Sequence, residues 1–183
     1  GKYIITDLNG DGEISDDDRT YVGDAQPDLT FGWQNNFTWK NWDFSFFFRG
    51  TIGNKVLNNP RAAYANNTYL IGTNALDDEL TYTMKESSRV CSYYLENGSF
   101  IRLDNLALGY TFDTKKINWL DKARLYFAAQ NLFVITGYKG LDPEVELFRG
   151  ESSDTDAGLS PGIEPRQFFP KARTFTLGVN LTF

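Results

Sequence analysis

The chain has 183 residues, a net charge of −6 at neutral pH, no histidine and a single cysteine. This acidic balance, without any basic stripe, argues against a nucleic-acid partner, and the lack of histidine removes the most common general base and many metal sites. Cys91 alone can form neither an internal disulfide nor a zinc cluster, so we expect a packed or inert thiol. No stretch approaches the roughly 18 consecutive apolar residues of a membrane helix.

Residues 7–18 match the spacing of a twelve-residue calcium loop. Gly12 stands at the sharp turn, and oxygen-bearing candidates occupy the ligand positions along the loop. These candidates are Asp7, Asn9, Asp11, Glu13 (through its carbonyl) and Asp18. The last position holds Asp in place of the longer, bidentate Glu, and no amphipathic helix precedes the loop. The pattern therefore predicts either a structural Ca²⁺ site or a glycine-rich turn that binds no metal, and no cofactor is otherwise required.

Two long alternating segments follow, at residues 29–40 and 42–52. Apolar side chains occupy odd positions in the first and even positions in the second, and a two-residue turn at Lys40-Asn41 explains this change of parity. We expect Asn41 to supply the positive φ that tight hairpins need. In this register, large apolar side chains face one another on one side of the hairpin: Trp39 and Trp42, Phe37 and Phe44, Trp33 and Phe48, Leu29 and Ile52.

The length of these two segments favours a membrane setting. A strand in a soluble protein usually has about 5–6 residues, whereas a transmembrane barrel strand needs about 9–11. The Trp39 and Trp42 pair beside the short turn would then lie at one membrane interface, as part of an aromatic girdle.

Three further strands are predicted at 99–112, 122–134 and 173–183. In the first of these, the apolar parity slips at Asp104-Asn105, which indicates a β-bulge. The last strand alternates without interruption, so that one face is apolar throughout. Its apolar residues are Phe175, Leu177, Val179, Leu181 and Phe183.

The connections between the predicted strands alternate between short and long. Short turns at 40–41 and 113–121 alternate with long loops at 53–98 and 135–172, the asymmetry of outer-membrane barrels. A short helix is expected within the first loop, at 76–85. The fold class predicted is all-β, the last five antiparallel strands of a transmembrane β-barrel with short periplasmic turns. Residues 1–28 would belong to an extracellular loop that carries the calcium-loop motif.

Five strands cannot close a membrane barrel, and open strand edges are not viable in lipid. We therefore expect the chain to be a piece of something longer, with the missing strands preceding Gly1.

Motifs spread over the whole chain carry a resemblance to one family. They are Asp7-Leu-Asn-Gly-Asp-Gly-Glu-Ile14, Asp18-Arg19, Val22-Gly23, Pro27, Asn97-Gly-Ser-Phe-Ile-Arg-Leu103, Leu108-Gly-Tyr110, Gln130-Asn-Leu-Phe133, Thr136-Gly-Tyr-Lys-Gly-Leu-Asp-Pro-Glu144 and Arg173-Thr-Phe-Thr-Leu-Gly-Val-Asn-Leu-Thr-Phe183. In this order and spacing they resemble the C-terminal portion of the SusC-like (SusC/RagA-type) TonB-dependent transporters of the Bacteroidetes outer membrane.

The resemblance implies a 22-stranded barrel in outer-membrane lipid, an N-terminal plug, energy from TonB and a SusD-like surface lipoprotein as partner. It also implies that the apolar residues of the last strand, ending on Phe183, form an assembly signal read by the barrel-assembly machinery. Neither the plug nor the segment that contacts TonB lies in this sequence.

Two functions remain open at this stage. The first is a part of an importer for glycans or peptides, which is not an enzyme; loop tyrosines such as Tyr64, Tyr69 and Tyr138 would either stack on sugars or pack within the loops. The second is a secreted calcium-dependent β module that binds carbohydrate or protein, because the loop at 7–18 also resembles a dockerin repeat. Solubility without detergent would distinguish the two.

Overall fold

A computed structural model of the chain describes residues 1–69, 72, 74–86, 90–114, 117, 119–145, 161–166 and 169–183. The chain divides into two compact units, which we call the sheet unit and the loop unit. The sheet unit comprises Pro27–Gly53, Gly98–Gly137 and Phe169–Phe183, and the loop unit comprises Gly1–Gln26, Asn54–Asn97 and Tyr138–Phe168. Within the described residues, no helix is both long enough and apolar enough to cross a membrane.

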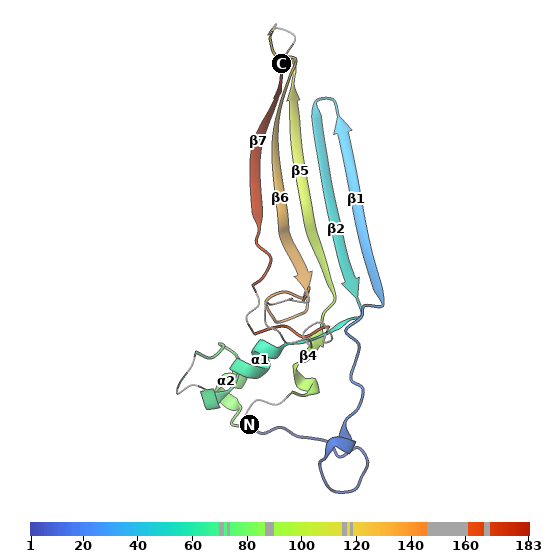
Figure 1. Ribbon diagram of the computed structural model, residues 1–183, viewed down its shortest axis with the longest axis vertical. Helices are drawn as coiled ribbons and strands as arrows, with labels where there is room; N and C mark the ends of the chain where they lie inside the picture. The colour runs from blue at the N-terminus through green and yellow to red at the C-terminus, as the bar shows by residue number, and fades with distance from the viewer. Residues whose placement is uncertain are drawn as a thin grey trace, which may run out of the picture. The chain divides into compact units, whose positions relative to one another are not determined.

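The sheet unit is one antiparallel sheet of five strands, drawn side by side in Figure 1 in the order β1-β2-β5-β6-β7. The strands are β1 (Leu29–Trp39), β2 (Trp42–Ile52), β5 (Phe100–Phe112), β6 (Lys122–Thr136) and β7 (Thr174–Thr182). Their bounds differ from the expected ones by two residues at most. The predicted all-β fold of antiparallel strands is confirmed, with β1 and β7 as its two edges.

The β1–β2 hairpin has the register expected from its parity, since Trp39 pairs with Trp42 and Phe37 with Phe44. The expectation that Asn41 takes the positive φ is wrong, because the residue in that conformation is Lys40, at 53°. The carbonyl of Asn41 accepts a hydrogen bond from the Thr111 backbone N–H at 2.8 Å. This hydrogen bond makes Asn41 part of the pairing between β2 and β5. The residue with positive φ in the turn is therefore Lys40, one position before Asn41.

The predicted bulge at Asp104 is confirmed. Phe47 pairs with Asn105 and Phe48 pairs with Leu103, so Asp104 is the extra residue on β5. Its carboxylate forms an ion pair with Arg49 at 3.1 Å.

A second irregularity lies beside the first, on β6. Asn105 pairs with Gln130, and Leu103 pairs with Phe133. Between these two pairs β5 has one residue and β6 has two, so β6 carries one extra residue. Asn131 has a φ of 51°, a conformation that asparagine tolerates better than most residues. The sequence pattern did not indicate this second bulge, because the apolar spacing on β6 resumes at Phe133.

The register places most large apolar side chains of the five strands on one face of the sheet, while Phe47 and Phe100 lie on the other. Phe44 pairs with Leu108, Leu108 pairs with Phe127, and Phe127 pairs with Leu177. This face is exposed over much of its area, since the side chains of Trp33 and Leu177 are 59 % and 73 % exposed. Soluble monomers rarely expose contiguous apolar areas of this kind.

The loop unit contains short elements, most of which the sequence pattern did not reveal. They are the two-stranded sheet of β3 (Lys55–Leu57) and β4 (Leu95–Asn97), the helices α1 (Asn59–Tyr64) and α2 (Glu79–Thr83), and the 3-10 turns η1 (Asp16–Asp18), η2 (Asn67–Tyr69) and η3 (Ser92–Tyr94). The long loop at 53–98 therefore holds several short elements, and among them α2 lies within the short helix expected at 76–85.

The helix α1 begins at a run of two asparagines and a proline, Asn58 to Pro60. The side chain of Asn58 caps it by accepting the Arg61 backbone N–H at 3.0 Å, and Pro60 lies in its first turn. Proline is well tolerated there, because the first helical N–H groups have no intrahelical partner. An Asn-Asn-Pro run thus starts a helix in this chain instead of interrupting the backbone.

Candidate functional site

The predicted calcium loop forms a compact turn closed by its own carboxylates. Asp7 accepts the backbone N–H groups of Gly10 at 2.6 Å and Gly12 at 2.8 Å. Both glycines have positive φ, at 81° and 84°, where a side chain would add strain. Asp18 accepts the N–H of Ser15 and that of Leu8, which joins the end of the loop to its beginning.

The remaining candidate ligands lie in the same turn. Asp11 accepts the backbone N–H of Glu13 and the side-chain amide of Asn9, both at 2.8 Å. The Glu13 hydrogen bond, followed by that from Asn9, holds the pKa of the Asp11 carboxyl below its usual range. The pKa of Asp18 is lowered in the same way, first by the N–H of Ser15 and then by that of Leu8.

These carboxylates are therefore ionised at neutral pH and offer the hard oxygen atoms that calcium prefers. Across the residues that the structure describes, no three carboxylate or thiolate side chains converge on a point where they could hold a metal ion. The fit to calcium would rest on single carboxylates together with amide and carbonyl oxygens, and the calcium site stays a prediction.

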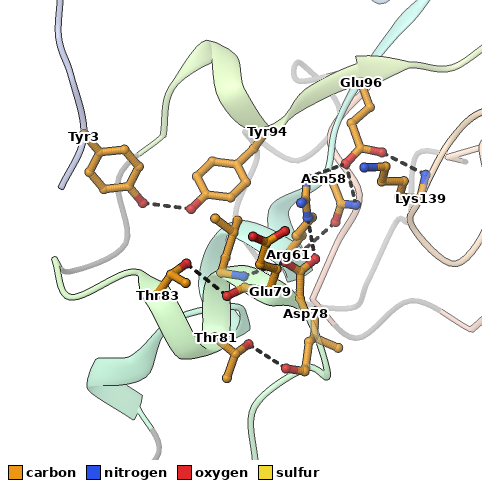
Figure 2. Close-up of polar contacts among 12 residues, drawn as sticks. Tyr3, Asn58, Arg61, Asp78, Glu79, Thr81, Thr83, Tyr94, Glu96 and Lys139 are labelled. Carbon is orange, nitrogen blue, oxygen red and sulfur yellow. Dashed lines mark hydrogen bonds and ion pairs between the residues drawn. The ribbon is translucent and has the colours of Figure 1, made fainter. Parts of the chain in front are cut away.

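A buried polar cluster organises the loop unit, and Figure 2 shows its members. The Arg61 guanidinium donates to Asp78 at 2.8 Å and to Glu96 at 3.3 Å. Glu96 also accepts the Asn58 side-chain amide at 3.2 Å and the Lys139 backbone N–H at 2.8 Å. Glu96 thereby ties the first long loop to the second, a connection that no local sequence pattern contains.

Burial and pairing act in opposite directions within this cluster. Desolvation disfavours ionised Asp78, but the Arg61 hydrogen bond, the Leu80 N–H and the Arg61 charge outweigh it and lower the pKa of the carboxyl. Arg61 is likewise desolvated, yet its two carboxylate partners raise its pKa. The side chains of Arg61, Asp78 and Glu96 are only 13 %, 21 % and 11 % exposed. The cluster is therefore a charged tie between loop segments rather than a set of groups poised for proton transfer.

A second buried contact lies within the later loop. The Tyr138 hydroxyl donates to Glu164 at 2.5 Å, and the Leu141 backbone N–H donates to the same carboxylate at 3.0 Å. Glu164 is fully buried, and a Cβ added to Gly140 would lie 2.3 Å from its Oε2 atom. Only glycine fits at that position without displacing the carboxylate.

Tyr138 packs inside the loop unit and does not offer a sugar-stacking surface, since it is only 6 % exposed. Burial, followed by the Glu164 hydrogen bond, raises the pKa of its hydroxyl. Of the other tyrosines considered, Tyr64 is half-buried, and the side chain of Tyr69 lies outside the described residues.

The residues on either side of Pro143 are linked by a hydrogen bond that a backbone N–H donates. Asp142 is 3 % exposed and accepts the backbone N–H of Glu144 at 2.9 Å. This is a local turn contact, in which one residue shapes the backbone of the other.

Four of the predicted assembly residues lie on β7, an edge strand that pairs with β6 over its whole length, and Phe183 directly follows the strand. Their exposed fractions range from 50 % at Leu181 to 73 % at Leu177 and Phe183. The Phe183 ring stacks on Trp119, with centroids 5.7 Å apart and planes inclined by 12°. An outward apolar face on this strand agrees with the sequence pattern, while recognition by the assembly machinery stays a prediction.

The opposite face of the sheet is polar and carries a fixed ion pair. Arg124 on β6 donates to Asp43 on β2 at 2.9 Å and 2.5 Å, reaching across Gly109 of the intervening strand β5. A Cβ at Gly109 would lie 2.4 Å from the Arg124 Nη2 atom, so glycine leaves room for the crossing. One exposed apolar face and one polar face with ordered charges define the wall of a membrane-spanning β protein.

No family model matches the chain. Over its whole length the chain is 36 % identical to TonB-dependent receptor P3 of Formosa agariphila, of which it covers 19 %. It is 30 % identical, over 98 % of its length, to TonB-dependent receptor SusC of Bacteroides thetaiotaomicron, of which it covers 17 %. Among solved structures it resembles the RagAB peptide importer in the closed-closed state, with a TM-score of 0.72, 26 % identity, and coverage of 97 % of this chain and 20 % of that one.

The chain therefore matches a C-terminal portion of the SusC-like TonB-dependent receptors, and it spans about a fifth of the length of the relatives that it matches. These relatives are receptors and importers rather than enzymes, and the outer membrane is the location that the family gives to this chain. The predicted family and location are confirmed.

Proposed function

We propose that this chain is part of an outer-membrane importer that takes up glycans or peptides, driven by TonB and assisted by a SusD-like surface lipoprotein. The observation that supports this proposal most directly is the two-faced sheet, whose apolar face is exposed and whose polar face carries the Asp43–Arg124 pair. Similarity to a structure described as a peptide importer supports peptide cargo, whereas glycan cargo rests on the SusC-like resemblance alone.

In this proposal the polar face of the sheet lines the passage. Asp43 and Arg124 present opposite charges that neutralise each other. The Arg124 guanidinium lies 5.2 Å from the ring centroid of Tyr126. A wall with paired charges and an aromatic ring suits neutral, polar cargo, because no large field of one sign repels or traps it.

The loop unit is proposed to be extracellular and to contact the lipoprotein and the cargo. Its internal polar groups are largely satisfied by one another, so the surface available to a partner is formed by exposed side chains such as Tyr21, Tyr82 and Tyr93. The Arg61 guanidinium lies 5.5 Å from the ring centroid of Tyr93, which orients that ring. Exposed, ordered aromatic rings are common anchors in protein and carbohydrate recognition.

An uptake assay tests the proposed function. Cells that lack the full-length receptor containing this chain should lose uptake of either labelled oligosaccharides or labelled peptides, and the native gene should restore it. Excess unlabelled glycan or peptide identifies the cargo class by competition. Uptake that persists without the receptor, or without TonB, would show that the proposal is wrong.

Two further parts of the proposal are tested separately. We propose a structural Ca²⁺ ion in the loop at 7–18, so chelation should lower the melting temperature of the native receptor but not of the Asp7→Asn variant. The alternative of a secreted calcium-dependent module requires the apolar sheet face to remain in water. A monodisperse product without detergent would favour that alternative.

A further inference from the structure

The turn between β1 and β2 holds a lysine in a backbone conformation that disfavours lysine. Lys40 has a φ of 53°, where a Cβ atom is crowded and where glycine or asparagine is usually found. The chain places its asparagine at the next position, Asn41, which does not have a positive φ. Since backbone strain tends to persist where a side chain has a role, the lysine charge at this point calls for an explanation.

Lys40 and the two tryptophans beside it offer hydrogen-bond donors, and no protein anion pairs with them in the part of the chain that the structure describes. Its ammonium lies 5.0 Å from the ring centroid of Trp39, and Trp39 and Trp42 are 67 % and 44 % exposed. Considering only described residues, no carboxylate pairs with Lys40, and neither indole N–H has an acceptor. We call these three residues the turn corner: Trp39, Lys40 and Trp42.

The turn corner adjoins the apolar face of the sheet. Trp42 packs on Tyr110 with ring centroids 4.8 Å apart, and Tyr110 packs on Phe112 at 4.9 Å. Indole rings favour the head-group layer of a membrane, where one end of the ring is apolar and the other is wet. A lysine at such a level extends its charge toward the head groups while its stem lies on apolar surface. A matching ligand needs an anionic head and long apolar tails.

We propose that the turn corner binds the phosphate group of a membrane glycerophospholipid, whose acyl chains lie along the apolar face of β1 and β2. Lys40 supplies the charge, and Trp39 and Trp42 supply indole N–H donors and apolar surface. The proposal rests on the location of the sheet in the membrane, and it does not depend on what the receptor imports.

Native mass spectrometry of the full-length receptor, titrated with dioleoyl phosphatidylglycerol, tests this site. Lys40→Asn removes the charge and also suits the positive φ, so the variant should fold at least as well as the native receptor. We expect it to bind the first lipid about fivefold more weakly, the factor that one lysine near an anionic surface contributes. Lys40→Arg should retain the native affinity.

Lys122→Asn is the matched control. Lys122 lies at the same end of the sheet but pairs with Thr182 on the polar face, so its loss should leave lipid affinity unchanged. Dioleoylglycerol, which has the same tails without phosphate, should bind equally to all variants. The proposal is overturned by an unchanged affinity in Lys40→Asn, by equal losses in Lys40→Asn and Lys122→Asn, or by equal binding of the two lipids to the native receptor.

Discussion

In the sheet unit the large apolar side chains lie exposed on one face, whereas the fully buried side chains of the loop unit include Glu164, Asn58 and Asn66. The sheet derives its order from backbone pairing and from a face that suits lipid. The loop unit buries apolar side chains such as Tyr94 and Val56 together with polar and charged groups that satisfy one another and fix its segments. The two units should therefore respond to different substitutions, and each prediction below separates them.

The largest effect is expected from Arg61→Met in the loop unit. The substitution leaves Asp78 and Glu96 buried without their shared cation, a loss that typically costs about 3–5 kcal/mol. Hydrogen exchange in the full-length receptor should accelerate over residues 54–97 and remain unchanged in β1 and β2. The matched control is Arg19→Met, because the Arg19–Asp16 pair is exposed and contributes at most about 1 kcal/mol. Equal effects of the two variants would contradict the proposed role of the cluster.

Gly50→Ala tests the sheet unit in the same way. A Cβ at Gly50 would lie 2.2 Å from the Phe100 carbonyl oxygen and 2.8 Å from the Phe31 ring, so backbone must move. Overpacking of this kind costs about 1–3 kcal/mol. The receptor should lose its resistance to heat on SDS gels at a lower temperature, while Gly137→Ala, with no atom within 4 Å of the added Cβ, should behave as the native receptor.

An effect of similar size, confined to one loop, is expected from Tyr138→Phe. Glu164 would keep the Leu141 N–H but lose the buried hydroxyl donor, at a cost of about 1–3 kcal/mol. Protease sensitivity of the second long loop should increase. The exposed Tyr82 hydroxyl offers the control, and Tyr82→Phe should leave the digestion pattern unchanged. A Tyr138→Phe receptor that resists protease as the native one does would show that this contact does not hold the loop.

The smallest expected effect is a change with pH. The pKa of Asp78 is lower in the folded loop unit than its usual value of 3.8, so its ionised form stabilises the fold. That stabilisation is complete above the usual value and is lost as the pH falls through the lowered one. The protection of residues 54–97 against hydrogen exchange, taken relative to the intrinsic exchange rate at each pH, should therefore fall below about pH 4. The acid sensitivity should shrink in Arg61→Met, which has already lost the partner, and an unchanged pH profile would count against this coupling.

The strands could be predicted from the sequence because a period of two survives in every one of them. The parity change between Phe37 and Phe44 alone determined the hairpin register, and the slip at Asp104 located a bulge. The residue with positive φ in the hairpin was assigned wrongly, because side-chain preference favoured Asn41 while the pairing with β5 decided the outcome.

The loop unit could not be predicted to the same extent, because its contacts join residues far apart in the sequence. Arg61 meets Glu96 across 35 positions, and Tyr138 meets Glu164 across 26. Neither pair leaves a periodic trace, since each depends on a single side chain. The calcium-loop spacing, in contrast, is local, and its turn could be anticipated even though its occupancy is still to be measured.

The two neighbouring bulges affect the shape of the sheet itself. Asp104 adds length to β5 relative to β2, and Asn131 lies where β6 gains length relative to β5, at the same level along the strands. Extra backbone in successive strands increases the local twist and bends the sheet along the line that joins the bulges. The sheet is thus bent along a line that crosses its strands, and this bend gives it a curvature that a flat sheet of five strands would lack. The residues at Asp104 and Asn131 therefore set how tightly this part of the wall can turn.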